Sequence, residues 1–366
     1  MLDKSQPEID TSAVTDYFQR TLDWRGNISI QPRQTGVNDI FDVTHEDSTY
    51  ILQRPTSQRI EPFFLPLQTE YTILTMLEDS SIPTPSVITY CDDPSIIGEE
   101  FILKEYLPGD AVLAGTKLPD RFQTPVARSQ ICQELVKILA DIHSLTPECD
   151  TLRQTTSLRD TPAKRLETFI DAYTDACSRT GRTFPGVDKA IEWLNQNIPE
   201  YNETTIVHGD LKPDNTILGP AASPTITGVI DWELCWIGDP FADLGFLLSF
   251  WFDPTDTPIQ ISDITDKYSD HEYLHQVKEI RENGFWSFTQ QPGAYSRNEL
   301  IQSYINITDR SPTSVEFYRI LAILQVTAIW ETWYANHQET ESNTDTPFEV
   351  LVPVQNNRLE AILSHD

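Results

Sequence analysis

The change of hydrophobic period near residue 110 constrains the fold of this chain more than any other feature of its sequence. Before it, short runs rich in β-branched and apolar residues alternate with turn residues, at 27–33, 38–43, 48–54, 86–90 and 100–106. Such runs are typical of strands, and their close spacing predicts a meander. After it, apolar residues recur at helical spacing over 124–145 and 313–338. The sequence therefore predicts a small β lobe followed by a larger, mainly helical lobe.

Two helices are expected within the β-rich part. The first lies near residues 12–23, with Asp10 or Thr11 as its N-cap. The second covers 65–80, between the third and fourth strands, and a segment with two prolines ends it. The expected fold class is α+β, with 1–107 as the N-terminal lobe and 108–366 as the C-terminal lobe.

Composition narrows the classes of function. The chain has 26 Lys and Arg against 56 Asp and Glu, a net charge of −30. This charge predicts binding neither to nucleic acid nor to an anionic membrane surface. The cysteines are odd in number and never form a CxxC pair, so they predict neither a disulfide framework nor a zinc site. They are Cys91, Cys132, Cys149, Cys177 and Cys235.

The apolar and charged segments point to a cytoplasmic protein. The longest nearly apolar stretch, 241–252, is too short to span a bilayer and contains Asp243. The first ten residues are acidic and lack the order of a secretory signal. With nine lysines, 17 arginines and scattered acidic residues, the surface resembles that of haloarchaeal cytosolic proteins. An acidic mesophilic protein is the alternative.

The segment His208-Gly-Asp-Leu-Lys-Pro-Asp-Asn215, followed by Asp231, carries the most specific chemistry. Phosphoryl transfer needs a carboxylate that orients the attacking hydroxyl and accepts its proton, together with oxygen ligands for Mg²⁺. Asp210 suits the first role. Asn215 and Asp231 suit the second, because amide and carboxylate oxygens are hard ligands. The apolar runs 216–218 and 225–230 predict a hairpin that would bring these ligands together beside Asp210.

The motifs HGDLKPDN, IDWE and GDPFADLG, in this order, resemble those of the aminoglycoside phosphotransferase and choline kinase-like family, relatives of the protein kinases. The resemblance runs from about residue 20 to 340 and implies a protein-kinase-like two-lobe fold that uses ATP and Mg²⁺. It implies that Asp210 is the catalytic base, that Asn215 and Asp231 bind the metal, and that His208 is the structural histidine of the catalytic loop. It also places Lys212 where a γ-phosphate contact is expected.

The resemblance is less complete in the N-terminal lobe, which it implies binds the nucleotide. Gly36 is the one glycine of the loop expected to cover the phosphates, where an ordinary hairpin turn is the alternative. Gln53 occupies the position of the family's strand cation, with Arg54 next to it. Because strand side chains alternate between faces, only one of the two can point into a cleft. Glu70 matches the family's glutamate that pairs with the strand cation.

Five other residues are assigned by position. The backbone at Glu105 and Leu107 matches the inter-lobe hinge that binds adenine in the resembling family. Asp239 precedes a proline suited to the first helical position and is expected to cap a helix, while the residue matching Asp243 steadies the catalytic loop in the family. His143 lies on the apolar stripe of its helix, where a packing role is expected.

These expectations converge on an ATP-dependent small-molecule phosphotransferase that acts on a hydroxyl of an amino sugar, a sugar, an amino alcohol or an aminoglycoside, as a monomer or homodimer. A protein kinase is the first alternative, but only eleven residues separate Asp231 from Asp243, too few for the activation segment of such an enzyme. A catalytically silent nucleotide-binding protein is the second alternative, favoured by the glycine-poor loop and by Gln53.

Overall fold

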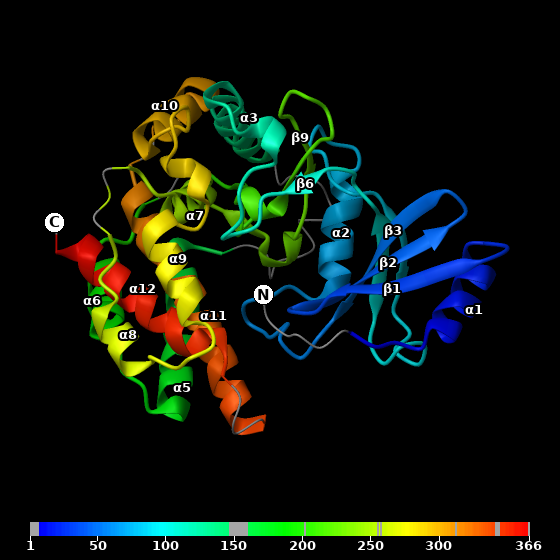
Figure 1. Ribbon diagram of the computed structural model, residues 1–366, viewed down its shortest axis with the longest axis horizontal. Helices are drawn as coiled ribbons and strands as arrows, with labels where there is room; N and C mark the ends of the chain where they lie inside the picture. The colour runs from blue at the N-terminus through cyan, green and yellow to red at the C-terminus, as the bar shows by residue number, and fades with distance from the viewer. Residues whose placement is uncertain are drawn as a thin grey trace. The chain divides into compact units, whose positions relative to one another are not determined.

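The computed structural model describes residues 7–145, 160–200, 203–254, 256, 258–311, 313–340 and 345–364. The chain divides into two compact units, coloured along the chain in Figure 1. The first unit combines Met1–Pro108 with Thr227–Leu234, and the second combines Gly109–Ile226 with Cys235–Asp366. The first unit thus includes a short segment from the middle of the chain, in addition to the contiguous lobe expected from the sequence.

The first unit is built on a five-stranded antiparallel sheet that matches the five predicted strands. Across the sheet the order is β1 (Ile28–Gln34), β2 (Asn38–His45), β3 (Ser48–Pro55), β5 (Phe101–Glu105) and β4 (Val87–Cys91). The predicted meander holds for β1 to β3. After the helical excursion the order changes, because β5 pairs with β3 and leaves β4 at the edge.

Helices cover both faces of this sheet (Figure 1). The unit's other elements are α1 (Thr11–Thr21), α2 (Leu67–Leu77), β9 (Ile226–Val229) and η4 (Trp232–Leu234). Leu52 of β3 belongs to an apolar cluster with Phe18 of α1. The next residue, Gln53, contacts Glu70 of α2, because consecutive strand residues point to opposite faces. Asp10 caps α1 as predicted, accepting hydrogen bonds from the N–H groups of Ser12 and Ala13.

The segment that returns to the first unit is held by backbone hydrogen bonds. The N–H of Val229 donates to the carbonyl of Pro83 at 2.6 Å. The N–H of Leu65 donates to the carbonyl of Glu233 at 2.8 Å. These bonds fasten β9 and η4 beside α2, since Leu65 lies two residues before that helix begins.

The second unit is mainly helical, as predicted. Its helices are α3 (Pro125–Ser144), α5 (Pro162–Thr180), α6 (Pro185–Gln196), α7 (Phe241–Phe250), α8 (Ser262–Lys267), α9 (Leu274–Asn283), α10 (Arg297–Thr308), α11 (Val315–Thr340) and α12 (Pro347–Leu363). Short 3-10 turns lie at η1 (Asp120–Phe122), η3 (Pro213–Asn215) and η5 (Ser287–Gln290). Its strands are β6 (Asp110–Ala111), β7 (Thr205–Val207), β8 (Thr216–Leu218) and β10 (Trp236–Gly238). Strand β8 and, in the first unit, β9 occupy the two apolar runs from which the hairpin was predicted.

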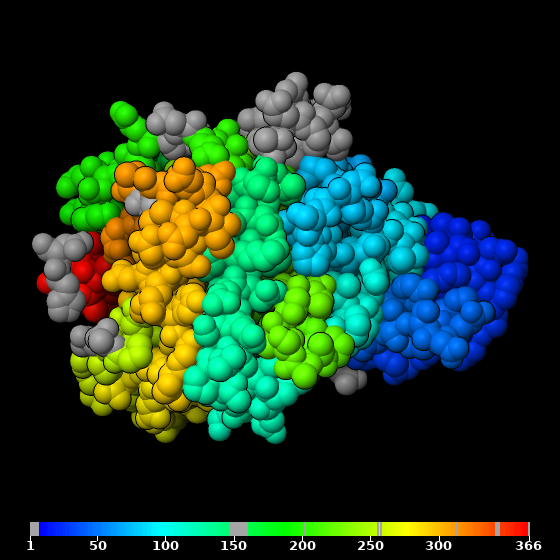
Figure 2. Space-filling model, turned by 90° about the horizontal axis from the view of Figure 1, so that it is seen from above, coloured from blue at the N-terminus to red at the C-terminus, as the bar shows by residue number. Residues whose placement is uncertain are grey.

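Helix α11 is central to this unit and packs against α5, α7 and α12. Helices α3 and α10 also pack together, and their blue-green and orange segments lie side by side in Figure 2. Among the helices of the described ranges, none combines the length and apolar character that crossing a membrane requires.

The contact between α7 and α11 depends on the absence of a side chain at Gly245. A Cβ atom at this position would lie 2.4 Å from the Cβ of Tyr318 and 2.8 Å from its carbonyl carbon. Real Cβ atoms do not approach other atoms this closely, so a side chain would force the two helices apart.

We therefore expect Gly245→Ala to lower the free energy of unfolding by about 1–3 kcal/mol, the usual cost of overpacking a core. Chemical denaturation would measure the change. Thr174→Ala, at an exposed position of α5, is the control and should stay within about 0.5 kcal/mol of the wild type. Equal stability of the Gly245→Ala variant and the wild type would contradict the close packing.

The described cysteines agree with the prediction of ordinary thiols. Cys91, Cys132, Cys177 and Cys235 are free, and Cys149 lies outside the described residues. Burial raises the pKa of the Cys132 thiol to about 12 and that of Cys177 to about 11. Both therefore stay protonated near neutral pH, which makes them poor nucleophiles.

Candidate active site

The predicted catalytic loop follows β7 in the second unit. Strand β7 pairs with β10, which fixes the point at which the loop starts. Gly209, the second loop residue, has φ +83°, a left-handed conformation that is strained for any residue with a side chain. Pro213 then begins the turn η3, which carries Asn215 back toward Asp210.

Asp210, Lys212 and Asn215 are brought together in this loop. The Asp210 carboxylate accepts hydrogen bonds from the Lys212 ammonium and, at 2.8 Å, from Asn215 Nδ2. The same Nδ2 donates to the backbone carbonyl of Asp210 at 2.8 Å. Asn215 Oδ1, the atom that would bind a metal ion, lies outside these two hydrogen bonds. The Asp210 side chain is 18% exposed, which leaves it accessible to a substrate.

Asp243, on α7, holds the start of the loop. Its Oδ1 accepts the N–H of Gly209 and its Oδ2 the N–H of His208, each at 2.8 Å. The His208 ring in turn accepts the N–H of Asp210 at 3.3 Å through Nδ1. Asp243 and His208 thus make hydrogen bonds that fix the backbone on either side of Gly209.

His143 extends this support from α3. Its Nε2 lies 3.2 Å from Asp243 Oδ2, and its Nδ1 lies 2.7 Å from the hydroxyl of Tyr304 on α10. His143 is 1% exposed. It is therefore more than the packing residue predicted from its helix stripe: it connects the loop's carboxylate to a second helix. The sequence carries no sign of this link, because its partners lie 100 and 161 residues away.

Two further residues border the loop. Asp239 accepts the N–H of Phe241 at 2.9 Å, the helix-capping role predicted for it. Asp214 accepts a hydrogen bond from the indole N–H of Trp286, a contact that sequence reasoning did not anticipate. Burial raises the pKa of the Asp214 carboxyl above its ordinary value, and the charge of Lys212 opposes this effect.

In the first unit, the side chains of Gln53 and Glu70 are hydrogen-bonded to each other. Gln53 Nε2 donates to both oxygens of the Glu70 carboxylate, at 3.2 and 3.1 Å. Gln53 is 2% exposed and Glu70 is 1% exposed. The amide supplies no charge, so the positive charge that Glu70 needs in the interior comes from elsewhere.

The positive charge beside Glu70 comes from two cations that the sequence reasoning did not single out. Arg59, in the loop after β3, donates from NH2 to Glu70 Oε2 at 2.7 Å. The Lys104 ammonium, on β5, donates to Gln53 Oε1 and lies 3.8 Å from Glu70 Oε1. Burial alone would raise the pKa of Glu70, but these two charges hold that pKa below its ordinary value.

Arg59 also bonds to the returning segment. Its NH1 donates to Asn38 Oδ1 at 2.9 Å, and Asn38 Nδ2 donates to Glu233 Oε2 at 2.6 Å. Arg59 NH1 lies 3.5 Å from the same Glu233 oxygen. Burial, together with the nearby negative charges of Asp231 and Glu70, raises the pKa of Glu233 to about 8. The positive charge of Arg59 opposes this rise.

Two other residues singled out from the sequence, Arg54 and Gly36, lie apart from Glu70 and its partners. The Arg54 guanidinium lies on the opposite face of the sheet, where it donates to Asp39 and to the carbonyl of Ile97. The carbonyl of Gly36 accepts a hydrogen bond from Thr56 Oγ1 at 2.6 Å.

Glu105 ends β5, where its N–H donates to the carbonyl of Ser86 at 2.9 Å, and Leu107 follows outside regular structure. Asp231 lies between β9 and η4 in the first unit with φ +62°, a conformation uncommon for a residue with a side chain.

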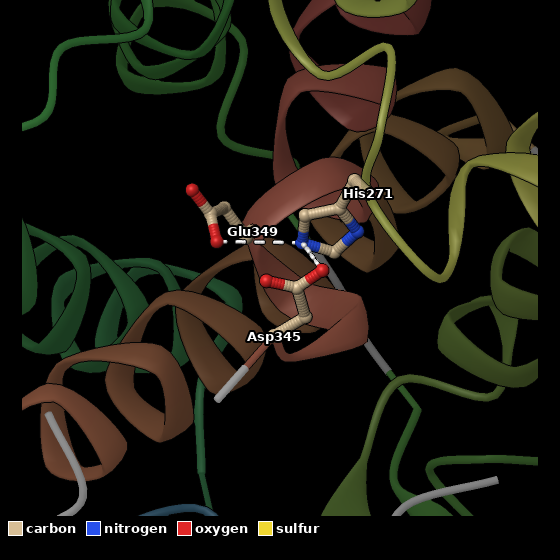
Figure 3. Close-up of side chains that lie close together, drawn as sticks. All are labelled: His271, Asp345 and Glu349. Carbon is tan, nitrogen blue, oxygen red and sulfur yellow. Dashed lines mark hydrogen bonds and ion pairs between the residues drawn. The ribbon is translucent and has the colours of Figure 1, made fainter. Parts of the chain in front are cut away.

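His271, Asp345 and Glu349 form the one group of the described residues with the spacing of a metal site (Figure 3). His271 Nε2 lies 3.3 Å from Glu349 Oε2 and 4.0 Å from Asp345 Oδ2. The backbone N–H of Tyr273 donates to His271 Nδ1 at 3.3 Å, which places the ring proton on Nε2. A metal ion would need the Nε2 lone pair, so this group is a hydrogen-bonded link between the segment before α9 and helix α12.

The curated relatives of this chain include several longer proteins. Acyl-CoA dehydrogenase family member 10 of Mus musculus is 30% identical over 222 residues, 61% of this chain and 20% of the relative. Acyl-CoA dehydrogenase family member 11 of Homo sapiens is 28% identical over 69% of this chain and 33% of the relative. The chain thus spans a fifth to a third of the length of these relatives. An aminoglycoside 3'-phosphotransferase of Streptomyces fradiae is 25% identical over 54% of this chain and 70% of the relative.

Solved structures with the same fold cover nearly the whole chain. A Ralstonia eutropha protein provisionally named an aminoglycoside phosphotransferase superposes with a TM-score of 0.71 at 20% identity, over 98% of this chain and 99% of the other. A choline kinase of Streptococcus pneumoniae gives a TM-score of 0.58 at 16% identity, over 96% and 98% of the two chains. These similarities confirm the predicted α+β, protein-kinase-like fold. Residues 29–280 match the model of the phosphotransferase enzyme family, and the chain therefore belongs to that family.

Proposed function

We propose that this chain transfers the γ-phosphate of ATP, with Mg²⁺, to a hydroxyl group of a small molecule. The observation that supports this most strongly is the Asp210 carboxylate, held by Lys212 and Asn215 and still partly exposed. A carboxylate fixed in this way can orient an incoming hydroxyl and accept its proton as the new phosphate ester forms. The family match makes phosphoryl transfer the natural use of this group.

Each residue of the loop has a distinct task in this proposal. Asp210 takes the proton of the acceptor hydroxyl, and the Lys212 ammonium beside it offers donors to the phosphoryl oxygens. Gly209 and Asp243 keep the loop in one conformation, so that the carboxylate is preorganised before substrate binds. His208 fixes the Asp210 backbone.

The residues present also fit Mg²⁺. Asn215 Oδ1 and the Asp231 carboxylate are hard oxygen donors of the kind that this ion prefers. When bound, Mg²⁺ would offset the negative charge of the phosphate oxygens.

The proposed acceptor is an amino sugar, a sugar, an amino alcohol or an aminoglycoside-like compound. Neighbouring structures include an aminopropanol kinase and a macrolide 2'-phosphotransferase, which supports a small acceptor. We propose a cytoplasmic enzyme that works as a monomer or homodimer. A catalytically silent nucleotide-binding protein is the alternative, and a protein kinase is the less favoured one, because the eleven residues between Asp231 and Asp243 leave no room for a long activation segment.

A panel of hydroxyl compounds with γ-labelled ATP tests the proposal. It should contain amino sugars, sugars, amino alcohols and aminoglycosides, and be run in low salt and in molar KCl. We expect label transfer to at least one class, abolished by EDTA and restored by excess Mg²⁺. Nucleotide binding without label transfer to any compound would favour the silent alternative, and transfer only to a protein substrate would favour the protein kinase.

A further inference from the structure

The face of the sheet that α2 covers holds a buried polar group in which the residue at the expected strand-cation position is neutral. We call it the Glu70 cluster: Gln53, Arg59, Glu70 and Lys104, each less than one tenth exposed at its side chain. One carboxylate and two cations meet there. The two cations, Arg59 and Lys104, differ in their capacity to bind a further anion.

All three guanidinium nitrogens of Arg59 donate to acceptors of the protein. Its Nε donates to the carbonyl of Leu65 at 2.8 Å, its NH1 to Asn38 and its NH2 to Glu70. Each nitrogen of the guanidinium therefore has an acceptor that fixes it. Arg59 balances the charge of Glu70 and ties the loop after β3 to α2.

Lys104 is held differently. Its ammonium has three donors, and its partners among the described residues are the amide oxygen of Gln53 and, at the longer distance of 3.8 Å, Glu70 Oε1. One of these acceptors is on β3 and the other is on α2. An ammonium on a four-carbon stem can keep these partners and still bind a phosphate oxygen.

The register of the sheet puts this ammonium beside the position that lacks a charge. Gln53 pairs with Ile102, and Lys104 is two residues further along β5, so Gln53 and Lys104 point to the same face. Arg54 cannot take this place, because it points to the other face and is bound by Asp39.

We infer that Lys104 is the cation that binds the α- and β-phosphates of the nucleotide, with Gln53 as the residue that positions it. The cation that the resemblance places on β3 is thus replaced by a lysine on the neighbouring strand β5. This inference rests on the proposed use of ATP and adds to it the anchor for the phosphates.

The test compares the affinities of ADP and adenosine, because their ratio isolates the contribution of the two phosphates. Binding is measured calorimetrically on the full chain without an acceptor. A lost charge-assisted hydrogen bond should reduce the ratio about 10- to 100-fold in Lys104→Met. The double variant Gln53→Lys with Lys104→Met returns the charge to β3 and should restore the ratio to within about threefold. Arg20→Gln removes an exposed cation of the same unit and should leave it unchanged.

The outcomes separate this inference from the proposed function. An unchanged ratio in Lys104→Met, with only a lower melting temperature, would mean that Lys104 merely neutralises Glu70. A reduced ratio in Arg54→Gln instead would identify the other cation. If Lys104→Met does not fold, the double variant decides: a folded protein that binds ADP no better than adenosine overturns the inference. A wild-type chain that does not prefer ADP to adenosine overturns both the proposed function and this inference.

Discussion

Replacing Asp210 with asparagine is expected to reduce kcat by about 10²- to 10⁴-fold, the usual contribution of a general base. The amide can still accept hydrogen bonds from Lys212 and Asn215, so the loop should keep its shape. It cannot accept a proton. ADP affinity should therefore change little while turnover falls, which steady-state kinetics with the best acceptor and calorimetry with ADP would measure.

Asp188→Asn is the matched control for this variant. Asp188 lies on α6 and is exposed, so the same chemical change should leave kcat within about twofold of the wild type. Undiminished transfer by Asp210→Asn would remove Asp210 from the role of base. Loss of ADP binding together with turnover would mean that the substitution disturbs the nucleotide site and not the proton transfer.

Asp243→Ala is expected to lower the free energy of unfolding by about 3–5 kcal/mol, the cost of removing one partner from a buried, charged network. The substitution leaves the backbone N–H groups of His208 and Gly209 without an acceptor in a site with no exposure. It also removes the carboxylate that contacts His143. Denaturation in urea, followed by tryptophan fluorescence, would measure the change.

Asp171→Asn, at an exposed position of α5, should change the stability by less than about 0.5 kcal/mol and serves as the control. Asp243→Asn is informative beside Asp243→Ala. One amide oxygen can replace one carboxylate oxygen, but the amide nitrogen would face an N–H donor, so most of the loss should remain. A loss below about 1 kcal/mol for Asp243→Ala would mean that the catalytic loop is held by other contacts.

Much of the fold could be predicted because hydrophobic period and capping residues are local properties of the sequence. The predicted helices near 12–23 and over 124–145 correspond to α1 (Thr11–Thr21) and α3 (Pro125–Ser144). The order of the sheet was not predictable in the same way. Whether β4 or β5 joins β3 depends on which strand buries its side chains best against α1 and α2, which no local pattern states.

In the candidate site, too, contacts within one local segment could be predicted and contacts between distant elements could not. Asp210, Lys212 and Asn215 lie within six residues, so their proximity follows from one loop and one turn. Arg59, Lys104 and the link made by His143 were not predicted, because each of these residues acts on a residue of a different element, up to 161 positions away. Strand alternation predicted that Gln53 and Arg54 face opposite ways, but only the positions of α1 and α2 decide which face each one takes.

The first unit is not a continuous piece of chain, and this affects how it can be synthesised and dissected. Leu65, in the loop before α2, and Asn38, at the start of β2, both donate hydrogen bonds to Glu233, which the ribosome delivers more than 160 residues later. A nascent chain that ends at residue 108 would therefore have its sheet but not the segment that completes its polar interior. Fragments cut between the units should fold poorly when expressed alone, and the first unit should regain its stability only when the chain extends through η4.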